Sequence, residues 1–167
     1  MKKVSVMVAA ILGLALSVGA NAQVSKKDQE FLNKAAVGGL YEVEAGRLAQ
    51  EKANSSDVKA FGEMLVKDHS SANDELKALA TSKSAVLPSE LPAEKKNRLA
   101  KVAESKHFDK EFIREVGIDD HRKDIKLFEK ASKNADDPQI KAFAAKTLPA
   151  LVNHREHAQD LQKSLGK

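Results

Sequence analysis

Four polar side chains interrupt apolar helical stripes, and these are the residues of the chain best suited to chemistry. They are Glu42, His69, His121 and His154. One glutamate with several imidazoles is a donor set for a divalent transition metal, because imidazole nitrogens suit zinc, copper, iron and nickel. A titratable group on the buried stripe of a helix must also be satisfied inside the fold. We therefore predict a buried polar layer made of these four side chains, and metal binding is one chemistry open to it.

The elements that position this layer are four long amphipathic segments. The apolar residues around His69 repeat at helical spacing, and similar patterns surround the other three polar residues. The predicted helices span residues 27–53, 57–81, 108–131 and 138–165. Each polar residue lies near the middle of its helix. Helices of similar length that pack side by side bring their midpoints to one level, so the four side chains are expected to converge whatever the topology.

Three aspartates lie close to the predicted layer as further ligands or as hydrogen-bond acceptors that fix the imidazole tautomers. They are Asp68, Asp120 and Asp124. On the third helix, the spacing places Asp120 and Asp124 near the centre of the apolar face and His121 toward its edge. His107 and His157 fall off the apolar stripes and are predicted to be exposed.

Three functions remain open for the layer: a metal site, a structural polar network that only specifies helix packing, and an acid–base active site. Nucleophilic catalysis has no support, because the chain contains no cysteine, no Gly-x-Ser-x-Gly elbow and no glycine-rich phosphate loop. We therefore expect a binding or structural protein rather than an enzyme. The competing non-catalytic interpretation is a structural or protein-interaction module.

The first 22 residues have the pattern of a cleaved secretory signal peptide. Two lysines precede an apolar run over residues 4–18, and Ala20-Asn21-Ala22 is a small-x-small cleavage site. A retained membrane anchor is the alternative, but the apolar run is short for a membrane span. We predict cleavage after residue 22, export to the periplasm, and no transmembrane anchor after cleavage.

Residues 23–167 are long enough for one domain with its own core. Removal of Lys2 and Lys3 lowers the formal charge of the chain from +4 to +2, with acids and bases interspersed. Basic patches interleaved with aromatic residues are missing from the sequence, so nucleic acid is not an expected partner. An envelope protein or a second copy of the chain remains open as the partner.

The spacing of the helices predicts an all-α, ferritin-like four-helix bundle. A short link at residues 54–57 pairs the first two helices, and Asp137-Pro138 starts the fourth after a similar turn. About 25 residues connect helices two and three, with Pro88 and Pro92 ahead of a short helix over 93–103. A connection of this length fits a crossover that returns the chain to the other end of the bundle.

Glycines at positions 38, 39 and 46 lie inside the first predicted helix, where each costs about 1 kcal/mol relative to alanine. Two reasons are open. Small residues allow close packing between helices, which is the simpler reason, or they leave room for a bound group beside Glu42.

Several motifs together resemble an exported bacterial family called domain of unknown function 4142. They are Gly39-Leu40-Tyr41-Glu42, Val58-Lys59-Ala60-Phe61 with Asp68-His69, His121 before Leu127-Phe128, and Leu148-Pro149 through His154. The resemblance implies a ferritin-like bundle in the periplasm or envelope and implies no established reaction.

The motifs depart from those of iron-oxidising ferritin-like proteins, which carry Glu-x-x-His on two helices. The residues three positions before His69 and His154 are Val66 and Leu151. A di-iron centre is therefore disfavoured. The cofactor is left open, and a mononuclear divalent transition metal is the form expected if the layer binds a metal.

Overall fold

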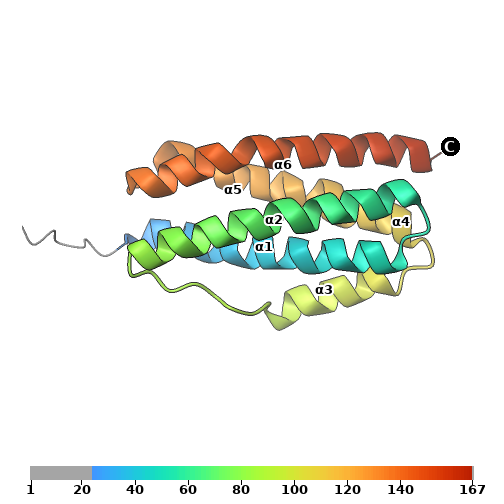
Figure 1. The fold of residues 1–167 in the computed structure, drawn as a ribbon, viewed down its shortest axis with the longest axis horizontal. Helices are drawn as coiled ribbons and strands as arrows, with labels where there is room; N and C mark the ends of the chain where they lie inside the picture. The colour runs from blue at the N-terminus through green and yellow to red at the C-terminus, as the bar shows by residue number, and fades with distance from the viewer. Residues whose placement is uncertain (1–23, 167) are drawn as a thin grey trace, which may run out of the picture.

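The structure, a computed structural model, describes residues 24–166, and within them the chain is an all-α bundle (Figure 1). The predicted signal peptide lies outside these residues. The elements are α1 (Lys26–Lys52), α2 (Ser56–Ser82), α3 (Ala93–Ala103), α4 (Phe108–Phe112), the π-helical segment η1 (Ile113–Asp120), α5 (His121–Asn134) and α6 (Pro138–Leu165). The four long helical segments and the short helix after the crossover are therefore confirmed.

Local sequence signals account for the starts of the long helices. The side chain of Ser55 accepts a hydrogen bond from the backbone N–H of Val58 at the start of α2. Asp137 does the same for α6, where Pro138 occupies the first helical turn and needs no N–H partner. These caps satisfy backbone donors that have no intrahelical acceptor.

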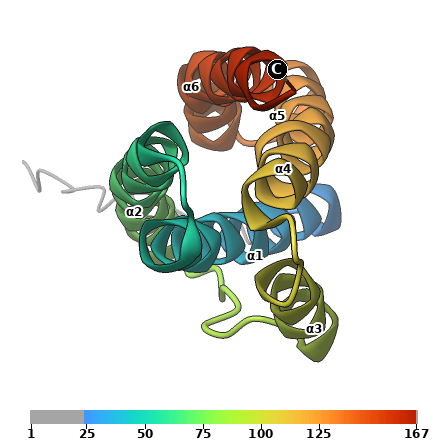
Figure 2. The same cartoon turned by 90° about the vertical axis from the view of Figure 1, so that its right-hand side faces the viewer.

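The topology is that of a ferritin-like bundle. Helices α1 and α6 run in one direction, and α2 and the continuous α4–η1–α5 rod run in the other (Figure 1). Residues 83–107 carry the chain back along the bundle between α2 and α4. Viewed along the bundle, α3 lies outside the four long helices, beside α1 and α4 (Figure 2). The predicted crossover with its own short helix is confirmed.

One prediction about the third helix is wrong. The segment expected to be a continuous α-helix contains the eight-residue π-helix η1 immediately before His121. A π turn holds about one residue more than an α turn, and each extra residue rotates everything after it by about 100°. His121, predicted near the edge of the apolar face, is therefore completely buried, whereas Asp124, predicted nearer its centre, is only half-buried.

The bundle core consists of two apolar clusters with the polar layer between them. One cluster fills the end near the α1–α2 turn and the other fills the end near the α5–α6 turn. On α2, for example, Leu65 belongs to the first cluster and Leu76 to the second, and His69 lies between them. The same order holds for His154 on α6 and for His121 at the start of α5, whereas Glu42 on α1 lies within the first cluster, between Tyr41 and Ala45.

Close packing explains one of the glycines. A Cβ atom on Gly46 would lie 2.5 Å from the backbone oxygen of Gly62, so α1 and α2 approach each other backbone to backbone. At Gly38 the situation differs, because a Cβ atom would meet the Asp124 carboxylate at an ordinary contact distance of 3.5 Å.

Candidate metal centre

Three imidazoles from three helices meet at the centre of the bundle. His69 comes from α2, His121 from the first turn of α5 and His154 from α6, and all three are buried. One ring nitrogen from each lies within 4.8 Å of the others. The structure therefore brings together the three histidines that the sequence proposed as ligands.

A chain of hydrogen bonds orients two of these rings. His154 Nε2 lies 3.0 Å from Asp68 Oδ2, at the partly exposed end of the chain. His154 Nδ1 lies 3.3 Å from His121 Nε2. His121 Nδ1 in turn lies 3.0 Å from the backbone oxygen of Val116. The chain thus runs from a surface carboxylate, through two imidazoles, to a backbone carbonyl.

The acceptors at the two ends of this hydrogen-bond chain indicate which ring nitrogens carry protons. The carbonyl of Val116 only accepts, so His121 carries its proton on Nδ1 and its lone pair on Nε2. The Asp68 carboxylate also accepts, so His154 carries a proton on Nε2 and a lone pair on Nδ1. With both rings neutral, two lone pairs face each other across 3.3 Å. In this pair of tautomers, either a third proton or a metal cation between or beside the two nitrogens would relieve the repulsion of the lone pairs.

The spacing suits a metal. Two imidazole nitrogens bound tetrahedrally, at bond lengths of roughly 2.0–2.1 Å, lie about 3.3–3.4 Å apart. That value matches the observed separation of His121 Nε2 and His154 Nδ1, 3.3 Å. Metal-bound histidines commonly donate their second N–H to a carboxylate or a backbone carbonyl, and these two rings have those acceptors in Asp68 and Val116.

Glu42 is the carboxylate of the layer with the least favourable surroundings for a charge. Its side chain is fully buried, and Oε1 lies 3.9 Å from His121 Nδ1, too far for a hydrogen bond. Neither carboxylate oxygen has a hydrogen-bond partner within residues 24–166. Burial, followed by the nearby carboxylates of Asp124 and Asp120, raises the pKa of Glu42 well above its usual value of 4.5. Glu42 does not belong to the group of ligand atoms within 4.8 Å of one another, which comprises His69, His121 and His154. A cation bound among those rings would favour the ionised form of Glu42 by charge attraction.

Burial favours the neutral, metal-binding form of His69 and His121 by lowering the pKa of each ring. Burial, followed by the neighbouring rings, lowers the pKa of His69 well below 6.5. Burial lowers the pKa of His121 to about 4 although its bond to Val116 opposes the shift. His69 Nε2 is buried and has no hydrogen-bond partner in the described part of the chain. Its lone pair is therefore available to a ligand in this layer.

The three aspartates proposed as neighbours of the layer have different surroundings. Asp68 of α2 has the predicted position, since it accepts a hydrogen bond from His154. Asp120 is paired instead with Arg98 of α3 and Lys123. Asp124 is half-buried beside Gly38, and burial raises its pKa to about 6.

Two groups that complete the site were not predicted from the sequence. Arg98 anchors α3 by pairing with Asp120 and with Glu115, whose carboxylate lies 2.6 Å away. Its position in a short helix after the crossover carries no local signal for this contact. The Val116 carbonyl reaches the His121 ring from five residues earlier, in the π-helix η1 that the helical spacing did not predict.

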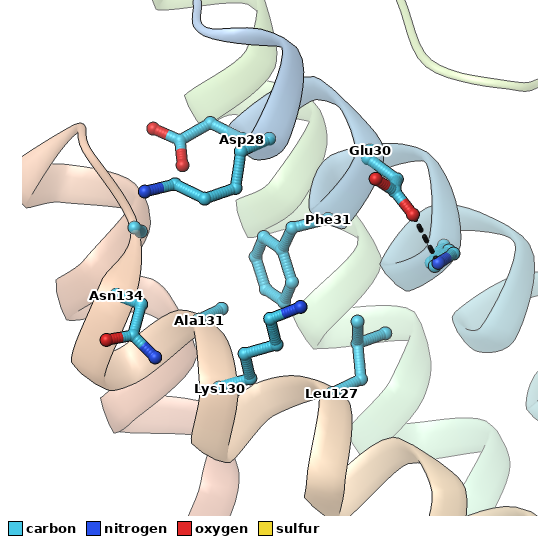
Figure 3. A pocket seen from close by; sticks show the side chains of 10 residues that line it. Asp28, Glu30, Phe31, Leu127, Lys130, Ala131 and Asn134 are labelled. Atoms are coloured by element: carbon cyan, nitrogen blue, oxygen red, sulfur yellow. Dashed lines mark hydrogen bonds and ion pairs between the residues drawn. The ribbon is translucent and has the colours of Figure 1, made fainter.

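A separate pocket of about 70 Å³ lies between the N-terminal part of α1 and the C-terminal part of α5 (Figure 3). Phe31, Leu127 and Ala131 form its apolar lining. Asp28 at its edge is buried, and its carboxylate accepts the backbone N–H groups of Asp136 and Asp137. Asp28 therefore ties the α5–α6 turn to α1, which is a structural role.

Fold and site together define a ferritin-like four-helix bundle with a buried histidine layer. The chain belongs to the family of the domain of unknown function DUF4142, whose sequence model matches residues 13–161. A search among curated proteins gives no significant match.

Solved structures share this fold at low sequence identity. The DUF305 fragment from Deinococcus radiodurans has a TM-score of 0.70 at 11% identity, over 87% of this chain and 99% of that chain. CopM in its Cu(II)-bound form has a TM-score of 0.71 at 16% identity, over 82% of this chain and 96% of that chain. Its Cu(I)-bound form gives 0.70 with the same identity and coverage.

Proposed function

We propose that this protein binds a single divalent transition metal ion in the layer formed by His69, His121 and His154, with Glu42 as the carboxylate donor. The observation that carries the proposal is the convergence of three ring nitrogens from three helices within 4.8 Å, with His121 Nε2 and His154 Nδ1 only 3.3 Å apart. Both rings are oriented by acceptors on their other nitrogens, so a cation is the natural occupant of the space they face.

The donor set defines which metals to test. Three imidazoles and one carboxylate form a mononuclear site suited to copper, zinc, nickel or iron(II). The layer lacks the second bridging carboxylate pair of a di-iron centre within the described residues. Copper is the first candidate, because CopM, which shares the fold, has solved Cu(II)- and Cu(I)-bound forms.

The proposal includes the place where the protein acts. Residues 1–22 have the pattern of a cleaved signal peptide, which would deliver residues 23–167 to the periplasm. None of the helices in residues 24–166 is long and apolar enough to cross a membrane. Sequestration of a transition metal in that compartment would protect the cell envelope from metal stress.

The competing function is a structural or protein-interaction module in which the layer only specifies helix packing. The hydrogen-bond chain from Asp68 to Val116 favours this alternative. Once a third proton is present, every ring nitrogen of His121 and His154 has a hydrogen-bond partner. In that case alanine variants of the layer lose stability to the same extent with and without metal.

Thermal unfolding with and without metal separates the two functions. Saturation at about 100 times the dissociation constant stabilises a protein by about 2.7 kcal/mol. For a domain of this size that free energy raises the Tm by roughly 5–10 °C. We expect Cu(II) or Zn(II) to produce such a rise in the wild-type protein. We expect the rise to be absent in His69→Ala and His154→Ala.

His157→Ala is the matched control, because His157 is exposed on the same helix as His154. It should retain the full metal-dependent rise in Tm. Equal Tm values of the wild-type protein with and without a panel of divalent metals would refute metal binding. Elemental analysis of protein purified from its native compartment then identifies the metal, and it also tests for the redox-active metal that an oxidase would need.

A further inference from the structure

A small, partly open pocket reaches the histidine layer from one side. It has a volume of about 20 Å³ and is lined by His69 and Asn73 of α2, Gly38 of α1, Asp124 of α5 and Thr147 of α6, among others. A volume of this size is enough for about one water molecule or a small ion. The imidazole that contributes to this lining, His69, is the one whose Nε2 lacks a hydrogen-bond partner within the described residues.

A groove of about 500 Å³ lies on the outer surface between α1, α3 and α5. Its walls include Asn33 and Val37 of α1, Lys95 of α3 and Leu127 of α5. This groove is much larger than the small pocket and more open to solvent.

The groove and the small pocket share two residues, Gly38 and Asp124. These residues therefore form the partition between the groove and the space beside His69. The partition is thin because Gly38 has no side chain, and a Cβ atom there would already contact the Asp124 carboxylate at 3.5 Å. Because this partition consists of one carboxylate side chain above a glycine, rotation of the Asp124 side chain opens it.

The charges around the groove leave Asp124 as the group suited to receive a cation. Lys123 is paired with Asp120 at 3.3 Å, and Lys95 lies 4.5 Å above the ring of Tyr41. Asp120 is further neutralised by Arg98. The Asp124 carboxylate makes no hydrogen bond to any residue between 24 and 166, so its oxygens are free to coordinate a passing ion.

We propose that the metal ion enters the layer through this partition, from the groove between α1, α3 and α5, past the Asp124 carboxylate over Gly38, and through the small pocket to His69. This inference rests on the proposed metal binding and adds the route by which the site is filled. It also gives Gly38 a role other than helix packing: the missing side chain keeps the passage open.

Rates of metal uptake and release test the route. Cu(II) is mixed with the purified mature protein in a stopped-flow spectrophotometer and binding is followed by absorbance; release is followed after addition of excess EDTA. We expect Gly38→Leu to slow both rates by at least roughly tenfold, equivalent to about 1.4 kcal/mol of added barrier. The equilibrium dissociation constant should stay the same, because a blocked passage raises the barrier in both directions.

Three further variants keep the test decisive. Gly38→Ala adds one methyl group at an ordinary contact distance and gains helix propensity, so it should fold and slow uptake to a smaller extent. Asp124→Asn keeps the size of the side chain and removes its charge, and it should also slow uptake. Ser89→Leu adds bulk to a different groove, which borders the small pocket through Asn73 and Leu76, and it should leave both rates unchanged.

Each outcome is informative. Unchanged rates in Gly38→Leu, in protein that binds Cu(II) with wild-type affinity, would refute the route and leave the metal site intact. Slow uptake in Ser89→Leu alone would place the entrance on the other side of α1 and would equally refute this route. Failure of the wild-type protein to bind Cu(II) at equilibrium would overturn the metal site and the route together.

Discussion

Replacement of Glu42 by methionine tests the central electrostatic argument, because it should affect the metal-free and metal-bound proteins in opposite directions. The Glu42 carboxyl group is fully buried and both of its oxygens lack partners among residues 24–166. A buried polar group without hydrogen bonds costs about 1–3 kcal/mol. Methionine has a similar length, is flexible and apolar, and fills the same space without that cost.

The expected magnitude follows from this cost. In a chelating buffer, Glu42→Met should stabilise the protein by about 2 kcal/mol, which raises the Tm of a domain of this size by roughly 4–8 °C. With excess metal the order should reverse, because the variant has lost the carboxylate donor and gains less from binding. The measurement is thermal unfolding by circular dichroism, with EDTA and with saturating Cu(II).

The pH dependence of stability in the wild-type and Glu42→Met proteins provides a second test. Glu42 has a folded pKa raised well above 4.5, so its contribution to stability is complete below pH 4.5 and is lost as the pH rises through the folded pKa. The loss amounts to at most about 1.4 kcal/mol per pH unit. His121, with a folded pKa of about 4, acts in the opposite sense, and its contribution is complete above about pH 6.5.

The Glu42→Met variant lacks the decline due to Glu42 and keeps the contribution of His121, so the difference in stability between the two proteins isolates the effect of Glu42. Metal-free wild-type protein should therefore lose stability relative to Glu42→Met as the pH rises above 4.5, as measured by urea unfolding. A lower Tm of Glu42→Met in EDTA, or parallel pH profiles of the two proteins, would show that Glu42 is stabilised by partners and would refute the reasoning.

Two further predictions concern the scaffold. Gly46→Ala places a methyl group 2.5 Å from the backbone oxygen of Gly62 and should destabilise the protein by about 1–3 kcal/mol in urea unfolding. Gly38→Ala should not destabilise it. Equal stability of the two variants would contradict the close approach of α1 and α2. Arg98→Ala leaves the buried carboxylate of Asp120 without its main partner and should cost about 2–3 kcal/mol, less than a fully buried pair because Arg98 is 24% exposed. Hydrogen exchange should show faster exchange in α3 of the Arg98 variant, and unchanged protection there would contradict the anchoring role.

Much of the fold follows from the sequence because its signals are local. The apolar spacing, the caps at Ser55 and Asp137, and the prolines before α3 determine where the helices begin and end, and the structure confirms these positions. The convergence of the histidines was also predictable, because helices of similar length that pack side by side align their midpoints. Whether the layer binds metal is a prediction that the unfolding experiments will decide.

The chemistry of the layer depends on contacts between residues distant in sequence, and only the tertiary structure determined these. The π-helix η1 turns His121 into the core and places the Val116 carbonyl against its ring, which a regular helical period cannot predict. Asp68 and His154 are 86 positions apart, and Asp120 finds Arg98 only because the crossover lays α3 beside the bundle. Periodicity specifies which face of each helix is buried. The packing of the helices decides which atoms meet, and therefore which lone pairs are left to hold a metal.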